Sequence, residues 1–479
     1  MNGRLASAAL LLALPGFVLA AHMSAGGYSM TTHWVGYLSL AIFALALVLV
    51  TVEEFINLPK SKPMILGAGI IWGLIGWYSS HAGSSAFAEQ AVRHNLLQYA
   101  ELMLFFLVVM TYINALAERR VFIALRSWVG QRRYSYRHVF WITGLGTFML
   151  SPLLDNLSTA LVMGAIVLNL ERDNRKFITL ACINVVVASN AGGVFSPFGD
   201  LTTLMIWQQD IASTTGRVDF FAFFNLLIPA LVNYLVPAIL MHFAVPTGVI
   251  TQPAEQRGMY RGARRIILLF ALTMVTAVFF QWQFFMPAAI GMMTGLSYLQ
   301  FFGYYLKKTH VPSDATVTTA EGPEFSVVVE KRQPFDIFLR VARAEWDTLL
   351  FLCGVILAVG GLGYLGYLTV LSELLYVHEG ITAANVSLGL VSSVLENIPT
   401  VSVVLAMQPQ MSLGQWLLVT LATGVGGSLL SIGSAAGVAM MGHARGKYTF
   451  FTHLRWTPAI ALGFVASIAC HLWLNAAQF

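Results

Sequence analysis

Three acidic residues stand in the middle of apolar stretches, each with amide or hydroxyl residues close by. Asp155 lies in SPLLDNLSTALVMGAI, Asp200 in ASNAGGVFSPFGDLTT and Glu396 in SSVLENIPTVSVVLAM. An isolated charge inside a membrane costs at least about 2.5 kcal/mol, so each acid needs a proton, a cation or an oppositely charged partner. No Lys or Arg stands within helical reach of Asp155 or Glu396. A salt bridge from elsewhere in the fold is the alternative for both.

Neutral oxygen ligands follow or precede these acids along the chain. They are Asn156, Asn190, Asn397, Ser158, Thr159, Thr202, Thr203, Ser431 and Ser434. Carboxylate and neutral oxygens together are the ligands that a hard cation such as sodium prefers. Because burial disfavours the charged form, an empty buried carboxylate holds a proton, which an arriving cation displaces. We predict one site where a metal cation and protons compete, with Asp155 and Asp200 as the pair that holds them.

The composition requires these residues to lie inside a membrane protein. The chain has 479 residues, of which 57% are hydrophobic and 10% charged. Apolar runs recur from end to end, and about 20 such residues suffice to cross about 30 Å of hydrocarbon. The formal charge of +5 comes from Lys and Arg in short loops, which disfavours nucleic-acid binding. The cysteines Cys182, Cys353 and Cys470 show no metal-ligand spacing, and we expect them to be inert core residues.

The apolar runs predict the spanning helices, and the charge of the loops predicts their direction. Helices are expected at 35–52, 64–79, 95–117, 177–208, 220–245, 265–284, 287–306, 348–370, 414–442 and 457–476. Lys and Arg gather in the loops 57–62, 118–137, 171–176, 246–265, 307–345 and 443–455. They are nearly absent from 80–94, 209–219, 371–386 and 408–413. By the positive-inside rule the first group of loops is cytoplasmic.

Two apolar segments are each interrupted by a proline and an acid, and neither can be assigned as one helix that crosses the membrane once. Segment 138–170 has basic residues on both flanks, whereas 387–407 has none on either flank. Each should therefore enter and leave the membrane on one side, from opposite sides for the two segments. We predict two re-entrant hairpins of opposite orientation.

The two halves of the chain resemble each other around these features. The matches pair Asp155 with Glu396, Asn156 with Asn397, Gly192 and Gly193 with Gly426 and Gly427, and Asp200 with Ser434. Each half places a hairpin before a Gly-rich broken helix, and the halves start on opposite sides. The predicted fold is an all-α polytopic membrane protein with two inverted-topology repeats, each with a re-entrant helical hairpin and a broken transmembrane helix. Such repeats place the transported ion near the midplane. A packing kink at small residues is the alternative for either break alone.

The chain is then organised by residue number as follows. We expect a signal peptide or a first transmembrane helix at 1–30, scaffold helices at 31–94, the first inverted repeat at 95–245 (hairpin 138–170, broken helix 177–208), scaffold helices at 246–306, a cytoplasmic linker at 307–347 and the second inverted repeat at 348–479 (hairpin 387–407, broken helix 414–442).

Titratable residues outside the breaks suggest a proton route. His94 and Glu101 lie seven residues apart on one predicted helix, and Glu345 with Asp347 begins another at the cytoplasmic face. They could form a proton entry path or a pH sensor. Pairing of charges at the membrane interface is the alternative.

The motifs SPLLDNLSTA, NAGGVFSPFGDLTT, SSVLENIPTV and GSLLSIGSAAG resemble those of the NhaD-type sodium/proton antiporters of the ion-transporter superfamily, along nearly the whole chain. The resemblance implies exchange of cytoplasmic Na⁺, and also Li⁺, for external H⁺, by a dimeric elevator-type transporter of the bacterial inner membrane that is active at alkaline pH. No cofactor is implied beyond the transported ions. The site residues that the motifs carry over are Asp155, Asn156, Asn190, Asp200, Thr202, Thr203, Ser392, Asn397, Ser431 and Ser434, with His94, Glu101 and Glu345 matching less specifically.

Two other functions compete with this one. The first is an anion carrier of the same superfamily, for a dicarboxylate or arsenite, which would share the repeat. Acids at both hairpin tips argue against it, because like charges repel at low dielectric. The second is a membrane-embedded enzyme, which is disfavoured because GxSxG, HExxH and P-loop motifs are absent from the sequence.

Overall fold

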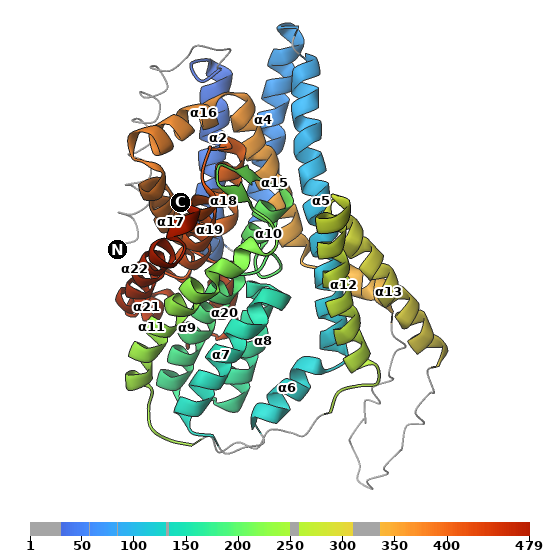
Figure 1. Cartoon of the computed structure of the whole chain (residues 1–479), viewed down its shortest axis with the longest axis vertical. Coiled ribbons are helices and arrows are strands. Elements are labelled where there is room, and N and C mark those ends of the chain that lie inside the picture. The colour runs from blue at the N-terminus through green and yellow to red at the C-terminus, as the bar shows by residue number, and fades with distance from the viewer. Residues whose placement is uncertain (1–29, 57, 84, 131–133, 250–257, 310–335) are drawn as a thin grey trace. The chain divides into compact units, whose positions relative to one another are not determined.

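The computed structural model describes residues 30–56, 58–83, 85–130, 134–249, 258–309 and 336–479. The predicted signal peptide or first helix lies almost wholly outside these residues. In the described part of the chain, seven helices are long and apolar enough to cross a membrane. The protein is therefore an all-helical, multi-pass membrane protein (Figure 1).

The chain divides into two compact units. One comprises residues 1–103, 126–256 and 346–479, and the other comprises 104–125 and 257–345.

Before the first hairpin the helices are α2 (Trp34–Thr51), α3 (Glu53–Ile56), α4 (Ser61–His81), α5 (Ser85–Glu118) and α6 (Val121–Gly130). After the first broken helix come a short strand pair, β1 (Ala212–Ser213) with β2 (Gly216–Arg217), the 3₁₀ turn η1 (Ala222–Leu226) and α11 (Leu227–Ala244). The last segment holds α15 (Trp346–Tyr364), α16 (Tyr367–Ser372), the π-helical turn η2 (Glu373–His378), α21 (Phe450–Leu454), α22 (Thr457–Leu474) and η3 (Ala476–Gln478).

The segment 138–170 forms two helices that turn at Asp155. Helix α7 (Tyr136–Leu154) carries Pro152 near its end, and α8 (Asn156–Leu170) starts directly after the turn. Asp155 has φ 63° and ψ 160°, a region of positive φ that is essentially confined to glycine, so the backbone at this turn is strained. Its carboxylate accepts a hydrogen bond from the backbone nitrogen of Ser158 at 2.8 Å, which caps α8.

The segment 387–407 turns in the same way at Glu396. Helix α17 (Ile381–Leu395) ends and α18 (Asn397–Met407) begins on either side of it, and Glu396 has φ 63° and ψ 162°. Its side chain does not cap α18. In Figure 1, within the first unit, α17 and α18 lie above α7 and α8.

Each hairpin is followed by a helix with a break. Helices α9 (Arg175–Gly193) and α10 (Leu201–Gln208) are separated by 194–200, and α19 (Leu413–Gly426) and α20 (Ala435–His443) by 427–434. Asp200 (φ −148°, ψ 150°) and Ser434 (φ −142°, ψ 146°) both stand at the start of the second helix of their pair. Extended backbone there lets a short polar side chain accept from the first helical turn.

Glycines allow the closest backbone contacts beside the breaks. A Cβ on Gly193 would lie 2.9 Å from the carbonyl oxygen of Gly199, and one on Gly427 would lie 2.7 Å from that of Gly433. Both distances are too short for a real Cβ. The glycines of the two motifs therefore keep the two breaks compact.

The hairpin α17–α18 packs on the second broken helix through Gly426, which makes a prediction about stability. A Cβ on Gly426 would collide with the backbone carbonyl of Gly389. We expect Gly426→Ala to destabilise the protein by about 1–3 kcal/mol through overpacking, seen as a lower midpoint of thermal unfolding in detergent. Gly442→Ala is the matched control, because a Cβ there meets nothing within 4 Å. Equal midpoints for the two variants would contradict this packing.

Several helix bounds differ from those expected. Helix α5 begins at Ser85, not near 95, so most of the predicted loop 80–94 is helical. An exposed ion pair between Arg93 and Glu89 at 2.8 Å, one helical turn apart, supports this polar first part. The loop 118–137 contains α6, and the linker 307–347 contains the short helix α14 (Ile337–Ala342).

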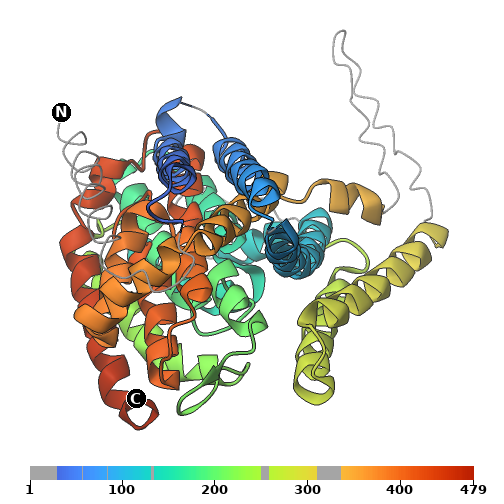
Figure 2. The same cartoon turned by 90° about the horizontal axis from the view of Figure 1, so that it is seen from above.

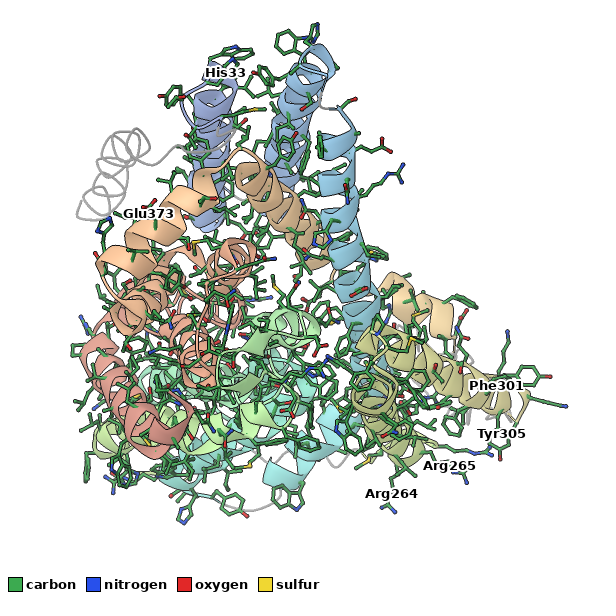
Figure 3. The ribbon with its side chains drawn as sticks, turned by 45° about the horizontal axis from the view of Figure 1, so that its top comes forward. His33, Arg264, Arg265, Phe301, Tyr305 and Glu373 are labelled. Atoms are coloured by element: carbon green, nitrogen blue, oxygen red, sulfur yellow. The ribbon has the colours of Figure 1, made fainter. Side chains whose placement is uncertain are left out.

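The second unit is built on two long antiparallel helices. Helices α12 (Ala263–Phe284) and α13 (Ala288–Lys308) pack side by side (Figure 2). The hydroxyl of Tyr112, from the end of α5 that belongs to this unit, donates to the carbonyl of Gly295 at 2.7 Å. Arg264 and Arg265 lie at one end of the pair with Tyr305 (Figure 3), as expected for a cytoplasmic end rich in basic residues.

Candidate functional site

Asp200 accepts hydrogen bonds from two side chains, one of which comes from the other half of the chain. Its Oδ2 accepts from Asn397 Nδ2 at 2.6 Å and from the hydroxyl of Thr202 at 3.0 Å. The hydroxyl of Thr203 accepts from the backbone nitrogen of Asp200 at 3.3 Å. Asp200 is only 5% exposed, and it takes part in none of the ion pairs found among the described residues. The first break and the tip of the second hairpin, far apart in sequence, therefore meet at one buried carboxylate.

A second chain of hydrogen bonds joins the first hairpin to both broken helices. Asn156 donates from Nδ2 to Asn190 Oδ1 at 3.3 Å, and Asn190 donates from Nδ2 to the hydroxyl of Ser434 at 2.9 Å. All three side chains are buried. Amides in series orient one another, because each amide has one accepting and one donating end. The residues that the motifs predicted at both breaks are thus connected in space.

Asp155 lies at the first hairpin tip next to this chain. It is 5% exposed, and one of its oxygens accepts from the backbone nitrogen of Ser158, as described above. Its neighbour Asn156 makes the contact with Asn190. The structure thus buries Asp155 and Asp200, the two acids of the predicted pair, within the same set of hairpins and breaks.

Hydroxyl groups near the breaks divide into two kinds. Ser392 donates to the backbone carbonyl of Thr423 at 2.8 Å, which fixes α17 on α19. In contrast, Thr159 Oγ1 and Ser431 Oγ are buried and make no hydrogen bond with any described residue. Buried polar atoms are nearly always paired with protein, water or an ion, so these two oxygens are available to a ligand.

Glu396 has a partner that the sequence did not indicate. Lys60 Nζ lies 3.2 Å from both carboxylate oxygens of Glu396, and both side chains are buried. A salt bridge from elsewhere in the fold, the alternative for this residue, is what the structure shows. Lys60 stands in the loop 57–62, whose basic residues predict only the direction of the helices. No local pattern in the sequence links it to Glu396.

The residues considered for a proton path lie in different units. His94 and Glu101 are both on the part of α5 that belongs to the first unit, and Glu345 belongs to the second. His94 Nε2 is 3.0 Å from Gln98 Nε2 on an exposed face, whereas Glu101 is partly buried. Among the described residues, no hydrogen bond links His94 or Glu101 to the breaks.

Apolar spanning helices around a buried polar centre define the class of protein, a multi-pass membrane transporter. A family model described as a citrate transporter matches residues 28–426. The Na(+)/H(+) antiporter NhaD of Vibrio cholerae is 51% identical over 483 residues, covering 100% of both chains. The protein of the same name from Alkalimonas amylolytica is 53% identical over 460 residues, covering 95% of this chain and 94% of the relative. Sodium/proton antiporter 1 of Arabidopsis thaliana is 28% identical over 439 residues, covering 89% of this chain and 70% of the relative.

The chain therefore belongs to the NhaD antiporter family, as the motifs indicated. The relatives named in these comparisons are transporters, so the chain belongs with transporters and not with enzymes. The citrate name of the broader family model does not favour the anion carrier, because the relatives matched over the full length are named as cation antiporters.

Proposed function

We propose that this protein exchanges cytoplasmic Na⁺, and also Li⁺, for external H⁺ as a secondary active transporter of the bacterial inner membrane. The observation that carries the proposal is the buried Asp200, which accepts hydrogen bonds from Asn397 and Thr202 and pairs with no base among the described residues. A buried carboxylate that lacks a basic partner needs a proton or a cation. The names of the full-length relatives point to the same pair of ions.

The proposed site joins the two acids to neutral oxygens. Asp155 and Asp200 supply the charge for the metal ion, and the side chains that complete the site or its coupling to protons are Asn156, Asn190, Thr202, Thr203, Ser392, Asn397, Ser431 and Ser434. Glu396 is left out of the proposed site, because its carboxylate pairs with Lys60. The unpaired hydroxyl of Ser431 supports this assignment, because it is a free oxygen ligand at the second break. When no cation is bound, protons neutralise the buried acids, and sodium displaces them. One site then exchanges the two ions without any further cofactor.

The proposed architecture is a pair of inverted repeats with re-entrant hairpins. Three similarities support it: the matching angles of Asp155 and Glu396, the matching angles of Asp200 and Ser434, and the equivalent glycine contacts in the two breaks. Alternating access in such repeats comes from the rigid-body movement of one bundle against another. The movement that we propose is of the elevator type, in which the bundle that holds the ion site moves against the scaffold helices of a homodimer. His94, Glu101 and Glu345 would serve proton entry or pH sensing.

Proton flux in everted membrane vesicles tests the function. We expect added Na⁺ or Li⁺ to dissipate a preformed pH gradient, and K⁺ or succinate to leave it unchanged. The response should be measured at several pH values with a fluorescent pH probe, against vesicles that lack the protein. A response to succinate but not to Na⁺ would replace the antiporter with the anion carrier.

A further inference from the structure

A cluster of charges with a buried centre lies beside the tip of the second hairpin, where the connection between α2 and α4 meets α15. Its centre is the pair of Lys60 and Glu396. Glu53 accepts from the backbone nitrogen of Lys60 at 3.4 Å. Asp347, at the start of α15, accepts from the hydroxyl of Ser61. The cluster thus holds one ammonium group and three carboxylates, all within the first unit.

Lys60 is held in this cluster by more than one contact. Its Nζ lies 3.2 Å from each oxygen of Glu396 and 4.8 Å from the ring centre of Phe351. Lys60 and Glu396 are each 7% exposed. Burial by itself lowers the pKa of Lys60, but the attraction of Glu396 and Glu53 outweighs burial and raises the pKa above its usual value. Lys60 is therefore a charged partner.

The two hairpin tips use the same backbone conformation differently. Asp155 folds back and caps its own helix through Ser158. Glu396 makes no cap bond, and its longer side chain reaches Lys60, 336 positions away in the sequence. The next residue, Asn397, donates to Asp200. The ion pair therefore anchors the peptide that presents Asn397 to the acid of the proposed site.

We propose that Lys60 is a positioning residue for ion exchange. It holds the Glu396 carboxylate away from the site and neutralises it, so that cation binding is confined to Asp155 and Asp200 while Asn397 stays on Asp200. This inference rests on the proposed exchange function. Loss of Lys60 alone leaves a buried carboxylate without its partner, one residue from Asn397, which is strongly unfavourable. Loss of both charges removes that defect.

A double-mutant cycle on Na⁺/H⁺ exchange in proteoliposomes tests the proposal. We expect Lys60→Met to lower the maximal rate of exchange at least about tenfold, because the buried carboxylate of Glu396 is then left without a partner. We expect Lys60→Met with Glu396→Gln to recover the rate and the KM for Na⁺ to within about threefold of wild type, since the two changes compensate each other. Glu396→Asp keeps the charge but shortens the reach, so it should resemble Lys60→Met. Lys62→Met, which changes an exposed lysine two residues on, is the matched control.

The double variant decides the outcome, with rates normalised to folded protein. If it is as inactive as Lys60→Met, or does not accumulate in the membrane, Lys60 does more than balance Glu396 and the proposal is wrong. If Lys60→Met exchanges ions like wild type, the proposal is also wrong. Failure of the wild-type protein to exchange Na⁺ for H⁺ would instead overturn the proposed function.

Discussion

Asp200→Asn is expected to abolish the dissipation of a pH gradient by Na⁺ while the protein still accumulates in the membrane. Asn is as good a residue as Asp at a helix start, so α10 should begin unchanged. What is lost is a charge: a carboxylate and a cation 4 Å apart attract each other by about 4 kcal/mol at an effective dielectric constant of 20. Because each 1.4 kcal/mol is tenfold in affinity, cation binding should fall by about a thousandfold. The measurement is the Na⁺ concentration for half-maximal response in everted vesicles.

The matched control for this variant is Asp210→Asn. Asp210 pairs with Arg217 on an exposed surface. The Asp210→Asn variant therefore removes one negative charge, as Asp200→Asn does, but changes no contact at the breaks. We expect wild-type exchange from it. A wild-type Na⁺ response from Asp200→Asn, with Asp210→Asn also normal, would remove Asp200 from the ion site.

Asp155→Asn is expected to have an effect of similar size for a separate reason. Asn has nearly the same size and shape as Asp, so the positive φ of this turn should cost it no more, and its amide oxygen can still accept from Ser158. The hairpin tip should therefore survive. The loss then reports the charge of Asp155, which a cation needs in addition to that of Asp200. We expect no response to Na⁺ or Li⁺ in the vesicle assay, with normal thermal stability in detergent.

Asp173→Asn is the control for the second variant, because Asp173 is exposed on the connection after α8. Combined substitution of Asp155 and Asp200 should be no worse than either alone if both serve one site. If Asp155→Asn exchanges Na⁺ as well as Asp173→Asn does, a site shared by the two acids is wrong.

The breaks could be predicted from local sequence patterns, because the polar residues of the proposed site also stand where helices begin. Asp155, Asp200 and Ser434 each stand at a helix start, where a short polar side chain accepts from the first turn. Glycines next to them permit close backbone contacts that any side chain would prevent. These effects act over a few residues, so they can be recognised in the sequence as acids, amides and glycines inside apolar runs.

The bounds of the helices were harder to predict. The length of an apolar run indicates how much of a helix lies in the hydrocarbon, but it does not indicate where the helix begins and ends. Helix α5 continues through polar residues 85–94 because turn-to-turn pairs such as Glu89 with Arg93 support it outside the apolar run. The helices α6 and α14 lie in loops identified only by their charge. Basic residues orient a loop but do not determine its conformation.

The membrane location, the resemblance to the NhaD family and the residues that interrupt the apolar segments can all be predicted from the amino-acid sequence, because membrane burial and helix termination depend on neighbouring residues. The pairing of those residues is visible only in the folded protein: Asn397 with Asp200, Asn190 with Ser434, and Glu396 with Lys60. These partners come from segments far apart in the chain. Their contacts depend on how the hairpins and broken helices pack together, and helical periodicity carries no information about that packing.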